Sequence, residues 1–394
     1  MFNHIQPSSP DPIMSLMEAY MQDPNPQKVN LGIGLYYDHQ GKIPLMQAVY
    51  IAEQRLLEQL RPHSYLPIEG SGLFASQIQT LLFGEESTLI ATVQTVGGSG
   101  ALKLGADFIY HFLSRREIWV SDPTWANHWA IFEGACLKVH TYPYFEDVSG
   151  QLRFDAMIDT LSSLPEGTVV LLHPCCHNPT GTDLNQVQWQ AVLDVVQQRR
   201  LLPFFDIAYQ GFGDGLDEDC FALREVLKSD LDFLVSSSFS KNVALYGQRL
   251  GGLSVRCSSV ETASHVKGAL KTLIRRSYSC PPAYGSQIVE TILADPQLRQ
   301  LWADELANMR QRIKQMRLSL SSGLERGVTT LDYTRIRDQK GMFSYTGLTE
   351  RQVSQLRQQY AIYLVAPGRI CLPGLNQRNV DYVTAAILDV TRAA

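Results

Sequence analysis

Hydrophobic positions in the middle of this chain form short apolar runs that alternate with stretches of helical spacing. Apolar runs bounded by turn residues predict six strands, at Thr92–Thr95, Ile118–Ser121, Thr168–His173, Leu201–Phe205, Phe233–Val235 and Leu253–Val255. Helical spacing between them predicts helices over 101–112 and 186–198. Strands that alternate with helices favour an α/β fold, in which a mostly parallel sheet is covered by helices on both faces.

The two ends of the chain follow a different pattern. Residues 1–30 are rich in proline around a short apolar segment, Ile13 to Tyr20, which predicts an extended arm followed by a short helix. A further helix is predicted over Ile43–Leu60. Beyond Pro282 the sequence predicts a long amphipathic helix over 298–324, and then short strands at 342–345, 362–365 and 370–372.

These ends predict a second, smaller α+β domain, because neither end holds enough apolar residues for a large core of its own. We therefore expect residues 1–42 to form an arm and the first part of a small domain, which residues 309–394 complete. Residues 43–308 would form the large domain. Within the small domain, Thr349 and Gln352 have the spacing of a capping box, and Asn376 is expected to cap the last helix.

Composition and charge exclude several classes of protein. The chain has 394 residues, of which 45% are hydrophobic and 19% charged, and a net charge of −5, so it offers no electrostatic attraction for nucleic acid or an anionic membrane. No apolar run reaches the roughly 18 residues of a membrane span, and the N-terminus lacks the pattern of a secretory signal. Seven cysteines occur without metal-ligand spacing. We expect a cytoplasmic protein without a metal site.

One lysine stands where α/β proteins place their chemistry. Lys241 follows the predicted strand Phe233–Val235 and three serines, Ser236 to Ser238. Ligands bind at the carboxyl ends of such strands, and burial near positive charge lowers the pKa of an ammonium group. A neutral amine can attack a carbonyl group and form a Schiff base. Taken alone, the stretch is equally consistent with a solvated loop lysine.

Other residues at strand ends suit a flat, phosphorylated ligand. Gly97 to Gly100 precede a helix and could cradle a phosphate, although a tight turn explains them equally well. Asp206 could pair with a protonated ring nitrogen, Asn178 could donate to a phenolic oxygen, and Trp125 could stack on a ring. Two histidines could support the acid or the ring: His128 and His173. For each, a purely structural role is the alternative.

Two arginines have a context that suits carboxylate binding. Arg369 lies in a turn that leads into a short strand, and Arg275 lies in the segment Ile274–Ser279. A guanidinium fork can bind a carboxylate through two hydrogen bonds, whereas an ordinary surface charge is the alternative. Together, the lysine, the acid, the tryptophan, the amide and the phosphate cradle point to pyridoxal 5′-phosphate.

Five motifs carry a resemblance that covers essentially the whole chain. They are Gly-Gly-Ser-Gly-Ala-Leu at 97–102, Asp-Pro-Thr-Trp-Ala-Asn-His at 122–128, His-Pro-Cys-Cys-His-Asn-Pro-Thr-Gly at 173–181, Asp-Ile-Ala-Tyr-Gln-Gly at 206–211 and Ser-Phe-Ser-Lys at 238–241. The chain resembles the class I aminotransferases of fold type I, in the branch that holds aspartate and aromatic-amino-acid aminotransferases. The resemblance implies a large domain that binds the cofactor, a small domain made from both chain ends, and a homodimer with active sites shared across its interface.

The resemblance also implies a role for each matching residue. Lys241 would carry the Schiff base and shuttle the proton, and Asp206 would pair with the ring nitrogen. The other cofactor contacts would come from Gly98, Ser99, Trp125, His128, His173, Asn178, Tyr209, Ser238, Ser240, Arg249 and, from the partner subunit, Tyr65. The substrate would meet Gly34, Trp125, Asn178, Arg369 and, across the dimer interface, Arg275.

Short segments around these residues look closer to the aromatic branch than to the aspartate branch. They are Gly34–Asp38, Ser64–Pro67, Leu172–Cys176 and Arg275–Ser279. The sequence departs from the commoner pattern at Pro367 and Cys371, on either side of Arg369. We expect ping-pong transfer of the amino group from phenylalanine, tyrosine or tryptophan, and also from aspartate, to 2-oxoglutarate. The alternatives are an aspartate aminotransferase, a pyridoxal-phosphate β-lyase and a nucleotide-binding dehydrogenase.

Overall fold

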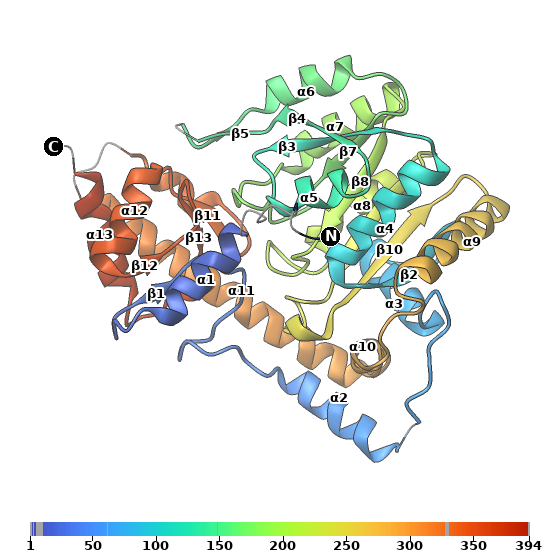
Figure 1. Cartoon of the computed structure of the whole chain (residues 1–394), viewed down its shortest axis with the longest axis horizontal. Coiled ribbons are helices and arrows are strands. Elements are labelled where there is room, and N and C mark those ends of the chain that lie inside the picture. Colours follow the sequence, from blue (N-terminus) through green and yellow to red (C-terminus); the bar gives the residue numbers. More distant parts are fainter. Residues whose placement is uncertain are drawn as a thin grey trace.

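A seven-stranded sheet forms the centre of the computed structural model, which describes residues 2, 4, 11–60, 62–147, 149–327 and 331–392. Its strands lie in the order β2-β10-β9-β8-β7-β3-β4 (Figure 1). Their bounds are β2 (Ile90–Val96), β3 (Glu117–Asp122), β4 (Lys138–Pro143), β7 (Val169–Leu172), β8 (Leu202–Ile207), β9 (Phe233–Ser238) and β10 (Leu250–Arg256). Only β10 runs antiparallel to its neighbours, so the predicted mostly parallel sheet is confirmed.

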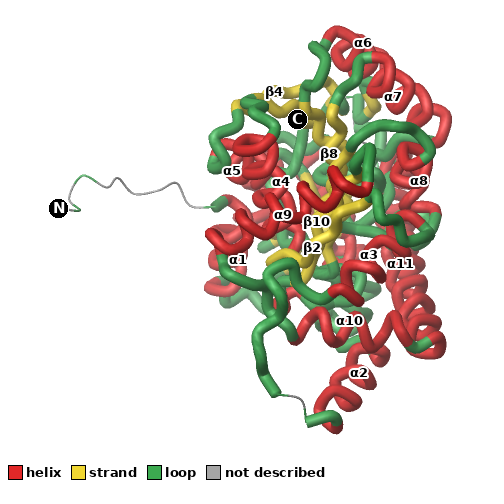
Figure 2. Tube along the Cα trace, turned by 90° about the vertical axis from the view of Figure 1, so that its right-hand side faces the viewer, coloured by secondary structure: helices red, strands yellow, loops and turns green. Residues whose placement is uncertain are grey.

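Helices cover both faces of this sheet (Figure 2). One face packs against α4 (Gly97–Phe112), α5 (Asn127–Glu133) and α9 (Val260–Ser277). The other packs against α3 (Gly72–Phe83), α7 (Gln186–Gln198) and α8 (Phe221–Leu227), and α6 (Phe154–Ser163) lies beside α7. Successive side chains of a strand point to opposite faces, so Phe204 belongs to the first core and Phe205 to the second.

Two predicted boundaries at the site are wrong. The strand predicted to end at Val235 continues through the three serines to Ser238, because its backbone pairs with β10 as far as Gly251. The prediction that Asp206 ends its strand is confirmed to within one residue, since Asp206 lies in β8 and pairs with Ser236. Helix α4 begins at Gly97 directly after β2, so no loop separates them. Sheet pairing and the close approach of elements extended the structure into polar and glycine positions.

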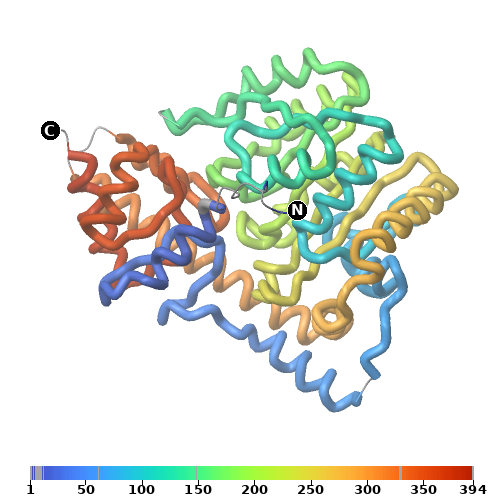
Figure 3. Tube along the Cα trace, viewed as in Figure 1, coloured from blue at the N-terminus to red at the C-terminus, as the bar shows by residue number. Residues whose placement is uncertain are grey.

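Both ends of the chain combine in the small domain, as predicted. Its N-terminal part is α1 (Pro12–Gln22) and β1 (Val29–Asn30), and β1 pairs in parallel with β12 (Ile362–Tyr363) (Figure 3). The rest comprises the end of α11 (Pro296–Glu325), β11 (Phe343–Tyr345), α12 (Glu350–Tyr360), β13 (Arg369–Cys371) and α13 (Val380–Thr391). The arm predicted before residue 11 lies outside the described residues, apart from Phe2 and His4. The boundaries at 42/43 and 308/309 stay predictions, and α11 runs through the second.

Local capping confirms one prediction and corrects two. Thr349 and Gln352 form the predicted capping box of α12. The cap of α13 is Asn379 rather than Asn376, whose side chain accepts instead from the backbone N–H of Arg378. The helix predicted from Ile43 begins as α2 (Gln47–Glu58), because Pro44 disfavours a helical conformation in the residue before it.

The remaining elements connect these layers. Helix α2 packs on α10 (Tyr284–Ala294) and on α11, which links the two domains. A small hairpin joins β5 (Phe145–Glu146) to β6 (Gln151–Leu152). Four short 3-10 turns complete the described fold: η1 (Glu218–Cys220), η2 (Tyr246–Gln248), η3 (Thr334–Asp338) and η4 (Leu372–Gly374). Within the ranges given above, no helix is long and apolar enough to cross a bilayer.

Candidate active site

A cavity of about 650 Å³ lies where the central strands end. Residues that follow β7, β8 and β9 meet in its wall, because parallel strands bring their carboxyl ends to one edge of a sheet. Of the residues that the sequence selects, the cavity is lined by Gly34, Gly98, Ser99, Trp125, His173, Asn178, Asp206, Tyr209, Ser238, Ser240, Lys241, Arg249 and Arg369. The structure therefore brings together all but three of the predicted site residues.

Lys241 lies in a turn directly after β9, largely withdrawn from water. Its Nζ is 5.0 Å from the ring centroid of Tyr209. Burial lowers the pKa of Lys241 to about 8, the charge of Arg249 adds to this shift, and the carboxylate of Asp206 opposes it. A lysine with such a pKa is partly neutral near pH 7, which is the form that reacts with a carbonyl group.

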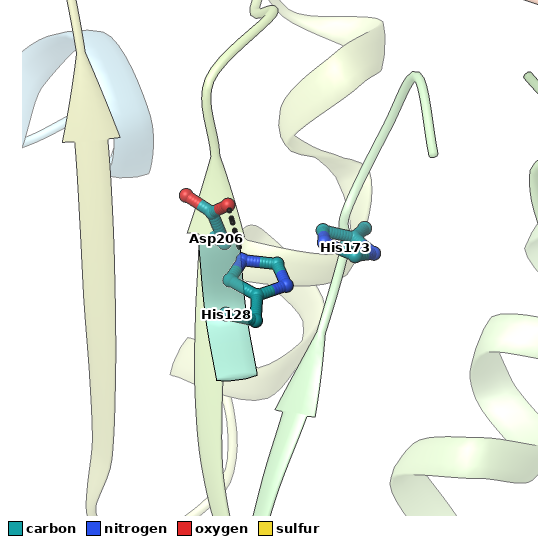
Figure 4. Close-up of side chains that lie close together, drawn as sticks. All are labelled: His128, His173 and Asp206. Carbon is teal, nitrogen blue, oxygen red and sulfur yellow. Dashed lines mark hydrogen bonds and ion pairs between the residues drawn. The ribbon is translucent and has the colours of Figure 1, made fainter. Parts of the chain in front are cut away.

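Asp206 is held from behind by a histidine. Its Oδ2 lies 3.3 Å from Nε2 of His128 (Figure 4). Nδ1 of the same ring lies 2.7 Å from Oγ1 of Thr124. When the hydroxyl of Thr124 donates to Nδ1, the other ring nitrogen carries the proton and donates to the carboxylate. Burial disfavours the charged form of Asp206, but the hydrogen bond from His128 and the nearby ionisable groups, including Lys241, together outweigh it, and the pKa is lowered. Asp206 is therefore a buried anion in the cavity wall.

His173 is half-buried, but both nitrogens of its ring are buried. It stacks on His128 with ring centroids 5.4 Å apart and an interplanar angle of 25° (Figure 4). Neither of its ring nitrogens makes a hydrogen bond within the described part of the chain. Burial, with the nearby His128, lowers the pKa of His173 to about 3, so the ring is neutral. Buried polar groups are normally satisfied, so the orphaned nitrogens indicate a polar ligand in the cavity.

The same trio raises the question of a metal ion. The ligand atoms of His128, His173 and Asp206 lie within 4.8 Å of one another. The His128–Asp206 contact already uses one nitrogen and one carboxylate oxygen of the three groups. The prediction that the site binds no metal stays a prediction.

One end of the cavity is built to hold an anion. The first turn of α4 directs free backbone N–H groups and the positive end of its dipole towards Ser238, Ser240 and Arg249. A Cβ at Gly97 would lie 2.6 Å from Nη2 of Arg249, and a Cβ at Gly98 would lie 3.0 Å from Cβ of Ser238. Glycine is needed at both positions for this close approach, and the resulting pocket of N–H, hydroxyl and guanidinium groups fits a phosphate.

The other end holds a buried arginine. Arg369 is 5% exposed, its Nη2 donates to the carbonyl of Gly32 at 2.6 Å, and its Nη1 lies 3.4 Å from Oδ1 of Asn178. The guanidinium carbon lies 4.4 Å from the ring centroid of Phe343. Its Nε has no partner among the described residues, and none of their carboxylates pairs with this arginine. Burial lowers the pKa of Arg369, and a bound carboxylate would counter that effect.

Three predicted residues do not line the cavity. His128 lies behind Asp206, as described above. The side chain of Tyr65 is 93% exposed, and Arg275, at the end of α9, is exposed and contacts Oγ of Ser279. The expectation that Tyr65 and Arg275 act in the site of a partner subunit stays a prediction.

The cavity also contains residues that the sequence analysis did not select. Six of them are apolar: Ile13, Met14, Ile33, Leu102, Ala208 and Phe343. Tyr246 lines the cavity as well, and its hydroxyl accepts a hydrogen bond from the backbone N–H of Tyr36 at 2.8 Å. The position of Tyr246 between Lys241 and Arg249 was an available signal. Nothing in the sequence around Ile13 indicated that α1 reaches this cavity, because that contact is purely tertiary.

Comparison with known proteins agrees with this geometry. The family model "Aminotransferase class I and II" matches residues 26–387. The chain is 48% identical to the aromatic-amino-acid aminotransferase of Escherichia coli K12, over 99% of this chain and 100% of that protein. It is 45% identical to an aspartate aminotransferase of Pseudomonas aeruginosa, over 99% of each.

A solved structure is similarly close. The aromatic-amino-acid aminotransferase of Burkholderia pseudomallei, covalently bound to pyridoxal phosphate, superposes with a TM-score of 0.96 at 45% identity over 100% of both chains. A match of this length, identity and shape to one family excludes the alternative of a nucleotide-binding dehydrogenase. The chain therefore belongs to the class I and II aminotransferase family.

Proposed function

We propose that this chain is a pyridoxal-phosphate-dependent aromatic-amino-acid aminotransferase. It transfers the amino group of phenylalanine, tyrosine or tryptophan, and also of aspartate, to 2-oxoglutarate. The observation that carries the proposal is one cavity in which a lysine of lowered pKa, Lys241, lies with a phosphate-type anion site and a buried, unpaired arginine, Arg369. Relatives and solved structures of that activity, which match the chain over its full length, support it.

The residues present fit the cofactor at each of its polar groups. Bound pyridoxal phosphate supplies an aldehyde for a Schiff base and a ring that accepts electrons. Lys241 would hold the aldehyde carbon, Asp206 the ring nitrogen, and Tyr209 with Asn178 the phenolic oxygen. Trp125 would cover the ring, and His173 would gain the partner that its nitrogens lack. The phosphate would be held by Gly98, Ser99, Ser238, Ser240 and Arg249.

Different residues of the chain bind the substrate and transfer its proton. Arg369 and the backbone of Gly34 hold the α-carboxylate and so fix the orientation of the α-carbon. The amine of Lys241, once free, takes the proton from the α-carbon of the substrate and would return it to the cofactor. Asp206 remains an anion throughout, because His128 stabilises its charge. The two half-reactions use the same residues in opposite directions, and the first product leaves before the second substrate binds, so the kinetics are ping-pong.

Apolar residues in the cavity lining support a preference for aromatic substrates. Ile13, Met14, Ile33 and Phe343 offer a surface against which an aromatic side chain can leave water. A dicarboxylic substrate needs a second cation, which Arg275 of a partner subunit would supply. Because some relatives are named aspartate aminotransferase, that activity is the alternative function.

Steady-state kinetics with single substrates test the preference. With 2-oxoglutarate as acceptor, we expect kcat/KM for phenylalanine and tyrosine to equal or exceed the value for aspartate. A value for aspartate at least ~100-fold higher, about 2.7 kcal/mol of transition-state stabilisation, would instead assign an aspartate aminotransferase.

A visible absorption spectrum tests the cofactor and the remaining alternative. The purified enzyme should absorb in the visible range, and the spectrum should change on addition of phenylalanine and return on addition of 2-oxoglutarate. A β-lyase would instead release pyruvate and ammonia from a cysteine conjugate without any acceptor. A colourless protein that pyridoxal phosphate cannot reconstitute would refute the proposal.

We also infer a homodimer, in which Tyr65 reaches the partner subunit's phosphate site. The 93% exposure of Tyr65 supports this inference, because tyrosine is enriched at protein interfaces, where its ring is covered and its hydroxyl finds a partner. A mixed dimer tests it: subunits with Tyr65→Ala and subunits with Lys241→Ala should regain activity when combined, since one site then has both native residues. Mixtures no more active than their parents would contradict the shared site. A cytoplasmic location stays our prediction.

A further inference from the structure

Two adjacent cysteines form part of the cavity wall. Cys175 and Cys176 are both free thiols, 5% and 3% exposed, and both line the cavity. Their Sγ atoms and a carboxylate oxygen of Asp219 lie within 4.8 Å of one another. The aminotransferase chemistry described above assigns no task to either thiol. A pair of thiols this close, facing a ligand-sized cavity, can bind a single soft atom.

The carboxylates beside the thiols are already in use. Asp219 accepts hydrogen bonds from the backbone N–H groups of Gly211, Gly213 and Asp214 at 2.8, 3.0 and 2.8 Å. Asp183 accepts from the N–H groups of Cys176 and His177 at 2.7 and 2.8 Å. A further hydrogen bond from the backbone N–H of Gly215, at 3.5 Å, fills the remaining acceptor site of Asp219, which is the carboxylate that lies with the two sulfurs. The site therefore offers two sulfur ligands, fewer than the four that a structural zinc ion takes.

Protonation also separates the possible ligands. Burial raises the pKa of Cys176 to about 12. The pKa of Cys175 is also raised, by the contact of its thiol with Cys176 and by burial. Divalent metals bind thiolates, so they would have to remove two protons from groups that resist losing them. A ligand whose reaction transfers both thiol protons to a neutral product does not release free protons overall.

We propose that the Cys175–Cys176 pair is a chelating, inhibitory site for trivalent organoarsenicals. An arsenoxide, R–As=O, reacts with two thiols to form two As–S bonds. The As=O bond breaks, both thiol protons leave on the oxygen as water, and arsenic keeps its +3 state, so no oxidant or reductant is required. The third bond of arsenic, to its organic group, extends into the cavity.

Occupation of this site should disturb the neighbouring site residues. Sγ of Cys176 lies 3.8 Å from the carbonyl oxygen of Tyr209, and Gly341 packs so closely that its Cβ, if present, would lie 2.5 Å from Cβ of Cys176. The pair also lies between His173 and Asn178 in the sequence. Drawing both sulfurs onto one arsenic atom would shift this segment and place an organic group in the cavity, so substrate binding should be lost.

Phenylarsine oxide added to the holoenzyme tests the site. We expect one phenylarsenic group per chain by intact mass, loss of two titratable thiols, and parallel loss of activity. A dithiol such as 2,3-dimercaptopropanol should restore activity, whereas 2-mercaptoethanol at equal thiol concentration should not. Chelation makes the second bond intramolecular, so Cys175→Ser and Cys176→Ser should each raise the concentration for half-labelling on the order of 100-fold.

Controls make the result decisive even if one variant folds poorly. Cys136→Ser, at an exposed cysteine outside the cavity, should keep wild-type labelling. Cys176→Ala offers a second way to remove the pair. Three outcomes would overturn the proposal: no adduct on the folded wild type, labelling that persists in both serine variants, or an adduct that leaves activity intact. The mass readout does not depend on the substrate, so it stands apart from the proposed aromatic activity.

Discussion

The two predicted substrate arginines differ in every structural respect. Arg369 is 5% exposed, bonded to Gly32 and aimed into the cavity from β13. Arg275 is exposed at the end of α9 and does not line the cavity. The cofactor residues Lys241 and Asp206 resemble Arg369, whereas Tyr65 resembles Arg275.

This contrast separates what one chain can build from what needs a second copy. Groups at the ends of packed strands are fixed by the core beneath them, so their geometry is complete within a single chain. Groups on exposed segments have no such support and gain a function only against a partner surface. Of the two arginines, the buried one should therefore serve every substrate, and the exposed one only those with a second carboxylate.

The largest effect should follow removal of the lysine that the cavity surrounds. Lys241→Ala removes both the cofactor anchor and the group that moves the α-proton, so turnover with any amino acid should fall by at least ~10⁴-fold. Single-turnover absorbance measurements check this. As a control, Lys228→Ala removes a lysine whose contact is an exposed ion pair with Glu225, and should keep normal turnover. Residual activity within tenfold of wild type would place the chemistry elsewhere.

Next comes the buried arginine. Arg369→Lys keeps the positive charge but loses bidentate hydrogen bonding to the α-carboxylate. The value of kcat/KM should therefore fall on the order of 100-fold for aromatic and dicarboxylic substrates alike. The measurement is the ratio of the losses for phenylalanine and aspartate, which should stay near one. A loss confined to aspartate would show that Arg369 serves the side chain rather than the α-carboxylate.

The exposed arginine should discriminate between substrates. Arg275→Leu removes a charge-assisted contact made only with a second carboxylate, so kcat/KM for aspartate should fall by roughly 10- to 100-fold. The value for phenylalanine should change by less than about threefold, because its ring makes no ion pair. Arg276→Leu, at the adjacent exposed position, is the matched control. Equal losses for both substrates would argue against the assigned role.

The smallest effect concerns pH. The pKa of Lys241 is lowered to about 8, so its neutral form appears at lower pH than for a free lysine. The rate at which cofactor-free protein captures pyridoxal phosphate should therefore rise about tenfold from pH 7 to 9, with a midpoint near 8. In Asp206→Asn the midpoint should move lower, since the Asp206 charge raises this pKa. A midpoint near 10 would mean that the lysine is not desolvated.

Sequence patterns located the site better than they located the elements that carry it. The five motifs contain ten of the thirteen predicted residues that meet in one cavity, and the other three are Gly34, Arg249 and Arg369. Yet the strand limit at Val235 was wrong, because a buried strand can include serines where a neighbouring strand supplies hydrogen bonds. The predicted loop at Gly97 was wrong as well, because glycine there serves the close approach of Arg249 rather than a turn. Such pairing depends on partners far away in the sequence.

By itself, the sequence determined the α/β class, the resemblance to fold type I aminotransferases and the identity of the reactive groups, since those depend on local periodicity and on residue type. Only the tertiary structure decided which groups are desolvated. It placed Arg369 beside Asn178, left both nitrogens of His173 without partners, and brought Ile13 and Met14 of α1 into the wall of a cavity made by distant strands. Burial and proximity set pKa values and binding surfaces, and both arise only when remote segments pack together.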